Sequence, residues 1–545
     1  MHTDLLSIFQ EGERALDNGD YRIALKQYKQ LNDLSPNNID ILNILGLIYL
    51  KLEIYSRSID CYQSISRLEN NFNPSTYLTL ATILIYAQRY PEAITILEKI
   101  IKFDQNSHIP FELIATAYLM SGEPHKAFNC SLEGLQRNPG SKYGFNNLGS
   151  ALRSLVMSSD AKIAFEAALD IDPTYYEARL NLGALQAAQG DHRGALITYD
   201  LALKNLSAEL EAHRPVILFY AAISQLSLGL LKEGWDNYEY GFSNLILSEC
   251  KRSPRRLFNV PQWNGDNLEN KKLLIWREQG ISDEILFMSC FNDLNISRSS
   301  IIIECSDRLV ETFRRSFPGC LIRPESNIDD GPIQLTDYDF HLPMGSLMKH
   351  TRKSLSDFAG KAPYITVSPE KVKKFKSRLD NIDPIRPKIG ISWRSGIKSP
   401  LRDLEIARLD NWSQILTDKD AVFVNLQYGD CESELKSIEE QLGIQIYRWR
   451  DIDLKNDLDD VFALIASLDL VITTGTAVYS MAGAVGVPTF AMMKPDNWTE
   501  LGLNFSPWYA NVKIFKTGET ISSSRMDAVS QDFKLALNRL RHTVK

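Results

Sequence analysis

The segment REQGISDEI (277–285) carries a carboxylate that is suited to act as a general base. Asp283 follows the apolar run KLLIW, so its loop is expected at the end of a buried strand, where it could take a proton from an attacking hydroxyl group. Gln279 and Gly280 precede it as candidate acceptor contacts, and Gly280 permits a tight turn. The alternative is structural, because Ser282 or Asp283 can equally cap the helix that follows.

A second loop, RSGIKSPLRDLEI (394–406), concentrates positive charge after the apolar run KIGISW. Arg394, Lys398 and Arg402 are well placed for phosphates, because cations offset the charge that grows on a departing diphosphate. A solvated surface loop is the alternative. In the next apolar run, AVFVNLQY, Gln427 is a candidate to present its side-chain amide to a nucleobase.

The third loop, TTGTAVYSMAGAVGVP (473–488), contains no charge and follows the mostly apolar run LDLVI. Small residues let the main chain approach a ligand, and the first free amides of a helix bind anions without a lysine. We therefore expect a diphosphate at Thr474, Gly475, Thr476 and Ala477. A tightly packed strand–helix crossover would explain the alanines and glycines but not the three threonines.

Other site chemistries are not favoured. The loop after KLLIW has neither a GxGxxG pattern nor an acidic residue at dinucleotide spacing. No histidine pair has metal-ligand spacing, so neither a metal ion nor a cofactor is expected. The DID (451–453) and DLD (457–459) triplets are interpreted as a solvated helix entry, because DIDLKNDLDD has few apolar residues.

Short apolar segments that alternate with helical stretches must position these three loops. The strand candidates are 272–276, 301–305, 321–324 and 339–344, then, after a helical stretch at 369–380, the segments 388–393, 421–428, 444–449, 468–474 and 488–493. This alternation predicts parallel, doubly wound sheets, and the two sets predict two Rossmann-like domains facing each other across a cleft. Ligands of such sheets bind outside the carboxyl ends of the strands.

The first half of the chain is periodic. One column of small residues has successive spacings of 34, 35, 34, 34, 34 and 39: Gly12, Gly46, Ala81, Ala115, Gly149, Gly183 and Ala222. A second column follows each by twelve: Ala24, Ser58, Ala93, Ala127, Ala161, Ala195 and Gly234. Aromatic residues come four later at Tyr28, Tyr62, Phe165, Tyr199 and Tyr238. Small residues let two antiparallel helices approach closely and the aromatic ring fills the space beside them, a pattern that resembles seven tetratricopeptide repeats over residues 5–245.

Such arrays commonly bind a peptide or protein on their concave face. Similar arrays on protein O-glycosyltransferases carry an asparagine ladder just before the small-residue column. Asn147 and Asn181 stand two residues before that column here, whereas Ile44, Thr79 and Leu113 depart from the ladder. The two asparagines are alternatively solvated residues of the helix surface, and the array is alternatively a homodimer interface.

Length and composition set outer limits. At 545 residues the chain exceeds one hydrophobic core, so two to four domains are expected. The balance of 60 basic and 68 acidic residues, a net charge of −8, argues against a general nucleic-acid or anionic-membrane binder. The acidic N-terminus does not resemble a secretory signal, no apolar run approaches a membrane span, and seven scattered cysteines never form CxxC. A cytoplasmic location is expected.

The segments EQGISDEI, ISWRSG, FVNLQYGD, LDLVITTGTAVYSMAGAVGVP and PWY resemble bacterial tetratricopeptide-repeat proteins with a C-terminal glycosyltransferase domain related to the lipopolysaccharide heptosyltransferases. The resemblance implies the GT-B fold, with two Rossmann domains, no metal, and the nucleotide-sugar held mainly by the second. The expected fold class is thus an all-α repeat superhelix (1–245), a linker (246–265), an acceptor-side Rossmann-like domain (266–366) and a donor-side one (367–545).

The resemblance also implies roles for individual residues. Thr474, Gly475, Thr476 and Ala477 would hold the donor diphosphate. Asp283 matches the aspartate of the family's Gly-Asp turn, a candidate general base, although Ser282 stands where relatives have glycine. Arg394 and Lys398 stand in the segment where relatives contact donor phosphates.

Three functions follow as hypotheses. The first is metal-independent sugar transfer from a nucleotide-sugar to a hydroxyl group of a glycan, a lipid-linked glycan or a protein, with the repeat array recruiting the acceptor or a protein partner. The second is a catalytically silent scaffold, in which a degenerate GT-B domain accompanies a protein-binding array. The third is epimerisation of a nucleotide-sugar on a similar double Rossmann fold.

Overall fold

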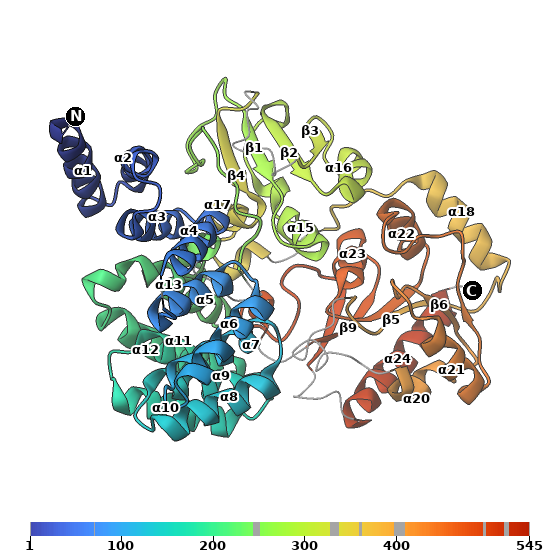
Figure 1. Cartoon of the computed structure of the whole chain (residues 1–545). Coiled ribbons are helices and arrows are strands. Elements are labelled where there is room, and N and C mark those ends of the chain that lie inside the picture. Colours follow the sequence, from blue (N-terminus) through green and yellow to red (C-terminus); the bar gives the residue numbers. More distant parts are fainter. Residues whose placement is uncertain are drawn as a thin grey trace. The chain divides into compact units, whose positions relative to one another are not determined.

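The computed structural model describes residues 2–69, 71–243, 251–326, 337–358, 362–396, 409–493, 497–516 and 523–543. The chain divides into two compact units, Met1–Leu185 and Gln186–Lys545. The first unit is entirely helical in its described residues, and the second contains further helices and two parallel sheets (Figure 1). Lys398 and Arg402 lie outside the described residues.

Antiparallel helix pairs build the first unit. The pairs are α1 (His2–Asp17) with α2 (Tyr21–Leu34), α3 (Ile39–Lys51) with α4 (Tyr55–Leu68), α5 (Pro74–Tyr86) with α6 (Tyr90–Phe103), α7 (Ile109–Met120) with α8 (Pro124–Arg137), and α9 (Lys142–Ser154) with α10 (Ser158–Ile171). Helix α11 (Tyr176–Ala188) begins the next pair, and the unit boundary falls within it.

The packing inside these pairs confirms the predicted role of the small residues. A methyl group added at Gly46 would lie 2.6 Å from the ring of Tyr62, and one added at Gly149 would lie 2.6 Å from the ring of Phe165. The hydroxyl of Ser58, from the second small column, donates to the carbonyl of Gly46 at 2.7 Å. The glycines therefore let the aromatic ring of the second helix lie directly against the backbone of the first.

The helical pattern continues at the start of the second unit. Its helices are α12 (His192–Lys204), η1 (Ala208–His213), α13 (Arg214–Ser227), α14 (Leu231–Tyr238) and η2 (Glu239–Phe242). The indole of Trp235 in α14 donates to the carbonyl of Arg352 at 3.0 Å, and its ring lies edge-on to Trp498, with centroids 6.3 Å apart. The last repeat therefore packs against residues that follow strands of both sheets in the chain.

The first sheet has four parallel strands in the order β3-β2-β1-β4. The strands are β1 (Leu273–Trp276), β2 (Ile301–Cys305), β3 (Leu321–Pro324) and β4 (Phe340–Pro343), and the helices are α15 (Ile281–Met288), α16 (Val310–Ser316) and α17 (Leu347–Thr351). β1 and β2 are buried along their whole length, as expected for a sheet covered on both faces.

The second sheet has six parallel strands in the order β10-β9-β8-β5-β6-β7. The strands are β5 (Lys388–Ser392), β6 (Val422–Asn425), β7 (Ile446–Tyr447), β8 (Leu470–Thr474), β9 (Thr489–Met493) and β10 (Val512–Lys516). The helices are α18 (Pro369–Asp380), α20 (Ser413–Leu416), α21 (Glu432–Leu442), α22 (Leu458–Ile465), α23 (Ala477–Val485) and α24 (Ser523–Thr543). If β5 to β10 are counted as the first to sixth strands of this sheet, their order is that of a doubly wound Rossmann sheet.

The segment expected to be a linker instead packs against the first sheet where it is described. The amide of Trp263 donates to His341 of β4 at 2.9 Å, and the ring of Phe258 stacks on the His341 imidazole, with centroids 3.9 Å apart. The guanidinium groups of Arg252 and Arg256 are fully buried and paired with Glu278 and Glu304. Basic residues suggested a solvated linker, but buried carboxylates in and directly after the strands supply their partners.

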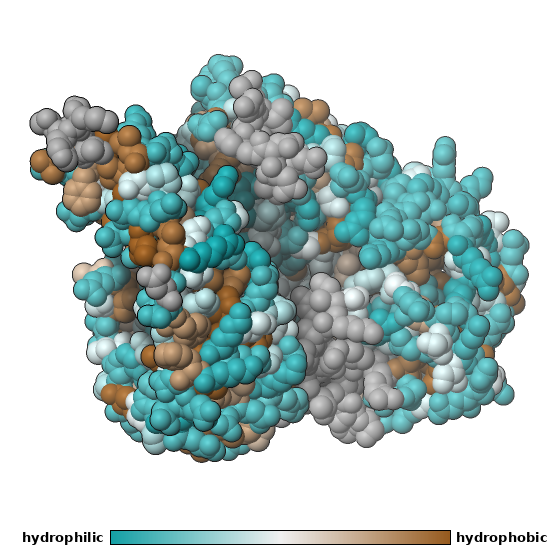
Figure 2. Space-filling view, in the orientation of Figure 1, coloured by the Kyte–Doolittle hydropathy of each residue, from teal (hydrophilic) through white to brown (hydrophobic). Residues whose placement is uncertain are grey.

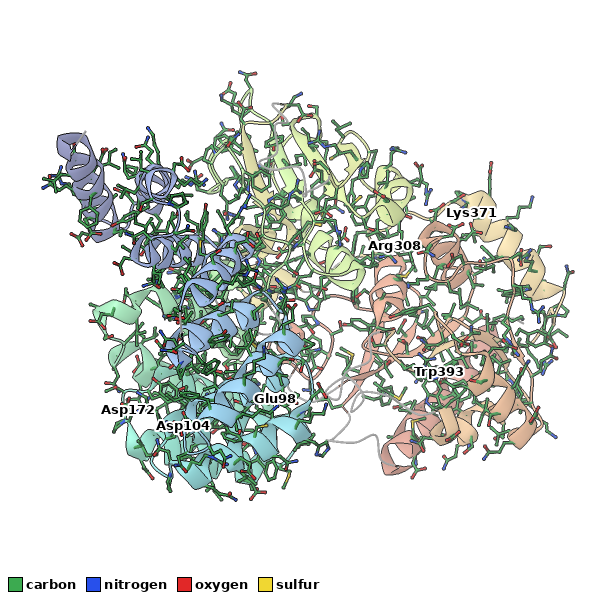
Figure 3. The ribbon with its side chains drawn as sticks, viewed as in Figure 1. Glu98, Asp104, Asp172, Arg308, Lys371 and Trp393 are labelled. Atoms are coloured by element: carbon green, nitrogen blue, oxygen red, sulfur yellow. The ribbon has the colours of Figure 1, made fainter. Side chains whose placement is uncertain are left out.

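The acidic run DIDLKNDLDD is the expected solvated helix entry up to Asp457, which is exposed and caps α22, but Asp459 and Asp460 are not solvated. Asp459, in the first turn of α22, accepts from the hydroxyl of Thr312 at 3.0 Å and pairs with Arg315 of α16. Lys371, on α18 (Figure 3), pairs with Asp459 at 3.0 Å and with Asp460 at 2.5 Å. These acidic groups join α22 to the first sheet's helix α16, so their charges are compensated within the unit.

The exposed surface is mostly hydrophilic, with apolar areas on the repeats (Figure 2). The exposed large apolar side chains of the described residues are concentrated before residue 243 and include Leu47, Tyr86, Phe103, Tyr143 and Ile163. Exposed apolar groups of this size on a helical array are typical of protein-binding surfaces.

Candidate functional site

The carboxyl ends of β5 and β8 mark the point at which the strand order of the second sheet reverses. β5 connects toward β6 and β7, whereas β8 connects toward β9 and β10. Ser392, the last residue of β5, lies opposite Thr473 of β8 in the register. The loops after KIGISW and LDLVITT therefore begin side by side, at the edge where doubly wound sheets bind their ligands.

Buried hydroxyl groups line the β8 side of this edge. Thr473, Thr474 and Thr476 are all buried, as is Ser392 on the β5 side. The hydroxyl of Thr473 donates to the carbonyl of Thr474 at 3.0 Å and lies 3.3 Å from the hydroxyl of Thr476. Gly475 is exposed, and a methyl group added there would lie 3.0 Å from the sulfur of Met493. The β5–β8 edge thus combines buried hydroxyl groups with a main chain that is exposed at Gly475.

The N-terminus of α23 opens onto the same edge. Thr476 is the N-cap residue with extended backbone, and its side chain makes no capping hydrogen bond. Ala477 begins the helix and is half-buried. The first amides of a helix have no acceptor within it, and the helix dipole adds positive potential there. The predicted set of Thr474, Gly475, Thr476 and Ala477 is therefore brought together in a form suited to an anion.

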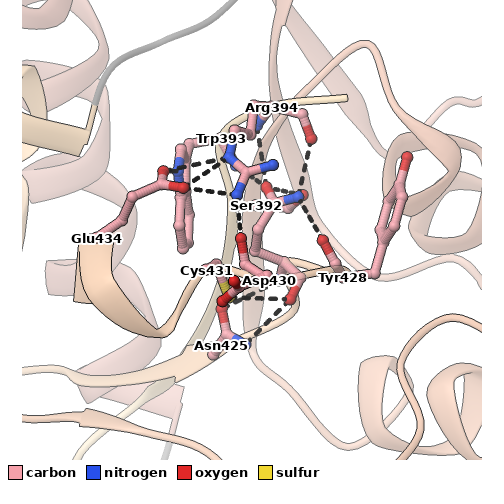
Figure 4. Close-up of polar contacts among 9 residues, drawn as sticks. Ser392, Trp393, Arg394, Asn425, Tyr428, Asp430, Cys431 and Glu434 are labelled. Atoms are coloured by element: carbon pink, nitrogen blue, oxygen red, sulfur yellow. Dashed lines mark hydrogen bonds and ion pairs between the residues drawn. The ribbon is translucent and has the colours of Figure 1, made fainter. Parts of the chain in front are cut away.

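Gln427 does not present its amide to a ligand in this structure. Its carbonyl oxygen accepts from the amides of Trp393 and Arg394, both at 3.0 Å, and its amino group donates to the carbonyls of Arg394 at 3.0 Å and Tyr428 at 3.1 Å (Figure 4). Only 1% of the residue is exposed. The side chain joins the loops after β5 and β6, and no donor remains for a nucleobase.

Arg394 is engaged by protein groups. Its guanidinium donates to Glu434 at 2.5 Å and to the carbonyl of Asp430 at 2.6 Å (Figure 4), and the Glu434 hydrogen bond raises the pKa of Arg394. A phosphate at Arg394 would have to share the cation with Glu434. Lys398, the other predicted phosphate contact, lies outside the described residues.

The helix that carries Asp283 meets α23. The hydroxyls of Ser282 and Ser480 lie 2.7 Å apart, and α15 and α23 lie side by side in Figure 1. Ser480 is one helical turn after Thr476, so the N-terminal part of α15, which carries Asp283, packs against the first turn of α23. The two helices that carry the predicted base and the predicted anion site, almost 200 residues apart in sequence, thus lie next to each other.

The loop before Asp283 has its unusual backbone at Gln279 instead of Gly280. Gln279 has a φ of +60°, and its amide donates to the carbonyl of Ser253 at 2.6 Å. Gly280 has extended backbone with φ −99° and ψ 176°, and its amide donates to the carboxylate of Asp283 at 3.0 Å. Asp283 therefore also caps α15, and the left-handed conformation of Gln279 places strain directly before it.

The equivalent edge of the first sheet, between β1 and β4, is filled by the chain itself. Glu278 follows β1 and is fully buried, with its carboxylate 2.6 and 2.7 Å from two nitrogens of Arg252 and 2.5 Å from the amide of Gly345. Arg252 also donates to Glu239 of η2 at 3.0 Å and to Ser346 at 2.9 Å. No sequence motif singled out these residues, since the two partners are 26 positions apart in sequence.

Glu284, the residue after Asp283, is a further buried carboxylate that the motifs missed. It lies 3.0 Å from Arg277 and accepts from the amide of Ser306 at 2.8 Å. Burial raises the pKa of Glu284 to about 7, against the attraction of Arg277. Glu284 does not adjoin the β5–β8 edge, so it supports the loop between β1 and α15.

The two asparagines of the repeats lie between helices instead of on a solvated ladder. Asn147 donates to the carbonyl of Glu112 at 2.9 Å and to the hydroxyl of Thr116 at 3.2 Å. Asn181 donates to the side chain of Asn146 at 2.9 Å. Both are half-buried and connect successive repeats, so in this structure their amides stabilise the stack.

The described residues offer neither a metal-ligand cluster nor a membrane-spanning helix. They contain no group of three or more His, Cys, Asp and Glu side chains arranged to hold a metal ion. Among them, no helix has the length and apolar character needed to cross a membrane.

Comparison with known proteins supports the repeat assignment. Residues 9–67 and 135–231 match the tetratricopeptide repeat family. The chain is 31% identical over 408 residues to the protein FlbA of Caulobacter vibrioides (strain ATCC 19089 / CIP 103742 / CB 15), covering 70% of this chain and 65% of FlbA. The chain thus spans just under two thirds of the length of that relative.

Solved structures of repeat proteins are also similar. A tetratricopeptide repeat protein from Parabacteroides merdae ATCC 43184 is 11% identical with a TM-score of 0.37, covering 44% of this chain and 94% of that chain. A thermophilic repeat protein of Thermus thermophilus is 18% identical with a TM-score of 0.30, covering 33% of this chain and all of that chain, 100%. The family match and the helix pairs together show that the all-helical N-terminal region consists of tetratricopeptide repeats, and the similarity to FlbA, at 70% of the chain, extends beyond them.

Proposed function

We propose that the chain is a glycosyltransferase of the GT-B type, which moves a sugar from a nucleotide-sugar to a hydroxyl group. The observation that supports the proposal is the 2.7 Å contact between Ser480, in the first turn of α23, and Ser282, the residue before Asp283. A carboxylate next to an anion-binding helix start is the pair that such a transfer requires.

The proposed reaction uses both groups at once. Asp283 takes the proton of the acceptor hydroxyl while the acceptor oxygen forms a bond to the anomeric carbon. The bond between that carbon and the donor diphosphate breaks, and its electron pair leaves with the diphosphate. The amides and hydroxyls of Thr474–Ala477 stabilise the growing negative charge, with Arg394 and Lys398 as candidate cations beside them.

The repeat array recruits the acceptor or a protein partner in this proposal. Its exposed apolar side chains, such as Leu47, Tyr86 and Tyr143, provide the kind of surface that repeat arrays use for proteins. The acceptor class stays open among a glycan, a lipid-linked glycan and a protein hydroxyl. A reduced cytoplasmic compartment, where nucleotide-sugars are made available, suits this chemistry.

The proposal is tested by screening the full chain for thermal stabilisation against a panel of nucleotides and nucleotide-sugars. A ligand that binds only the folded state raises the melting temperature as its concentration exceeds the dissociation constant. The stabilising nucleotide-sugar is then assayed for release of its nucleotide, with wild type and Asp283→Asn compared. Release should fall at least ~100-fold in the variant, as expected for loss of a general base, while donor binding is unchanged.

A protein-binding scaffold without catalysis is the second candidate function. The pairing of Arg394 with Glu434 favours it, since Glu434 already occupies a cation that a donor phosphate would use. Turnover of any nucleotide-sugar that depends on Asp283 excludes this candidate. Failure of every nucleotide and nucleotide-sugar to stabilise the chain would favour it.

A further inference from the structure

Tyr428 lies directly after the Gln427 amide, at the carboxyl end of β6. β6 neighbours β5, which in turn neighbours β8, so Tyr428 and the start of α23 lie on either side of the loop after β5. Two strand spacings separate them along this edge, about 10 Å. A ligand whose phosphates lie at α23 and whose remainder extends across β5 therefore reaches Tyr428.

The ring of Tyr428 is fixed against the loop after β5. Its hydroxyl oxygen accepts from the amide of Gly396 at 3.2 Å. A methyl group added at Gly396 would lie 2.6 Å from the ring, so glycine at this position is needed for the close contact. The backbone of Gly396 is not in the left-handed region, so its conformation does not by itself require glycine. The close approach of the Tyr428 ring therefore explains why residue 396 is glycine.

Several peptide groups around Tyr428 already make hydrogen bonds to Gln427. The carbonyls of Arg394 and Tyr428 both accept from the Gln427 amino group, and the amide of Arg394 donates to the Gln427 carbonyl. Figure 4 shows the Tyr428 ring standing apart from this hydrogen-bonded cluster. The ring is half-buried and lies beside polar groups that already hydrogen-bond to Gln427.

We propose that Tyr428 is the stacking platform for the nucleobase of the donor, held in place by Gly396. This inference rests on the proposed function, because it assumes a nucleotide whose phosphates lie at α23. Stacking on an aromatic ring favours a nucleotide over bare phosphate and is tolerant of base identity, since every base has a planar face. Gln427 keeps the platform in position, and its amide does not contact the base.

The test is isothermal titration of the full chain with the most stabilising nucleoside diphosphate and, separately, with inorganic pyrophosphate. Tyr428→Ala should weaken binding of the nucleoside diphosphate by at least ~10-fold, the loss expected for one base stack, and leave pyrophosphate binding unchanged. Tyr428→Phe keeps the stacking face and should bind within about 3-fold of wild type. Tyr240→Ala, at a tyrosine that is 43% exposed outside the site, serves as the control.

Gly396→Ala provides an independent variant that leaves the tyrosine in the chain. The added methyl group displaces the ring, so this variant should also lose affinity for the nucleoside diphosphate. In the Tyr428→Ala background, Gly396→Ala should have no further effect, because the two changes act on the same stack.

Three results would overturn the inference. Unchanged nucleoside diphosphate affinity in Tyr428→Ala removes the platform and leaves the proposed function standing. An equal loss for nucleoside diphosphate and pyrophosphate shows that the loop, instead of the base contact, was disturbed. Failure of the wild-type chain to bind either ligand removes the proposed function and the platform together.

Discussion

Glu284 shows how burial changes the properties of a single residue beside the candidate base. Its carboxyl group is fully buried against Arg277 and the amide of Ser306, and its pKa is raised to about 7 from 4.5. A folded-state pKa above the unfolded value means that the folded chain binds the proton more strongly. The corresponding stability is complete below about pH 4.5 and is lost as the pH rises through 7.

Glu284→Gln should therefore gain stability relative to wild type as the pH rises from 5 to 8. The neutral amide fills the same volume and does not ionise, so the difference should change by about 1–3 kcal/mol across this interval. Melting temperatures of both proteins at matched pH values measure it. A difference that stays constant or falls with pH would show that Glu284 is ionised in the folded chain throughout.

The sequence indicates a candidate site most clearly where main-chain amides would bind the ligand, and less clearly where one side chain would. TTGTA was predicted to bind an anion because small residues and threonines after a buried strand are informative by residue type. Gln427 was assigned to a base because its amide is polar, but the register of β5 and β6 places two peptide groups within its reach. Glu278 and Arg252 were missed, since a buried ion pair between residues 26 apart in sequence leaves no local pattern.

At the scale of elements, the residue types at two facing positions of each repeat depend on each other. Glycine in the first small column faces an aromatic residue sixteen positions later, as in Gly46 with Tyr62 and Gly149 with Phe165. Alanine in the same column faces a smaller side chain at Leu97 or Ser131, although Ala222 with Tyr238 departs from this rule. Volume is therefore balanced within most pairs.

Gly149→Val should destabilise the first unit because the new side chain would overlap the ring of Phe165. Overpacking of this kind costs about 1–3 kcal/mol. Hydrogen exchange of the α9 and α10 amides measures the loss locally and should be accelerated in the variant. Gly140→Val, in an exposed turn where an added methyl group lies 3.6 Å from its nearest neighbour, is the matched control and should leave exchange unchanged.

A double variant separates overpacking from other effects of the substitution. Gly149→Ala with Phe165→Leu reproduces the Ala81–Leu97 pair that the chain already contains. Exchange in α9 and α10 should then return close to the wild-type rate. Protection that is equally lost in Gly140→Val, or not lost in Gly149→Val, would contradict the packing account.

The strands were predicted well because parallel strands buried on both faces are continuous apolar runs. IIIEC (301–305) and the helix at 369–380 have the predicted bounds, and the other predicted strands contain the observed ones. β10 (Val512–Lys516) was not predicted, since VKIFK has an edge strand's mixed polarity and lacks that signal. The packing of residues 251–263 was also missed, because its basic residues find partners only in the folded sheet.

At the scale of the whole molecule, the compact second unit begins at Gln186, earlier than the composition change near residue 245. The reason lies in contacts that the last repeat makes with residues far along the chain. Trp235 bonds to Arg352 and packs against Trp498, and Gly502 and Gly229, both with positive φ, allow close backbone contact between their loops. The last helical pair is therefore part of the structure that carries both sheets.

The central claim for the whole chain is that the edge between β5 and β8 binds the phosphates of a nucleotide. Thr476→Glu places a negative charge at the N-cap of α23, where the helix dipole favours it. Because Thr476 is buried, a melting curve of the variant checks that the larger side chain leaves the fold intact. The new carboxylate would occupy the amides and repel the ligand. Thr417→Glu, at an exposed threonine of the same domain, is the control.

Isothermal titration of the full chain with a panel of nucleoside diphosphates tests this claim most directly. The account predicts saturable binding of at least one nucleoside diphosphate to wild type and to Thr417→Glu, and a loss of at least ~100-fold in affinity in Thr476→Glu, since a carboxylate of the same sign as the phosphates replaces a neutral hydroxyl group. Equal affinity in Thr476→Glu and wild type, or no binding of any nucleoside diphosphate to wild type, would contradict it.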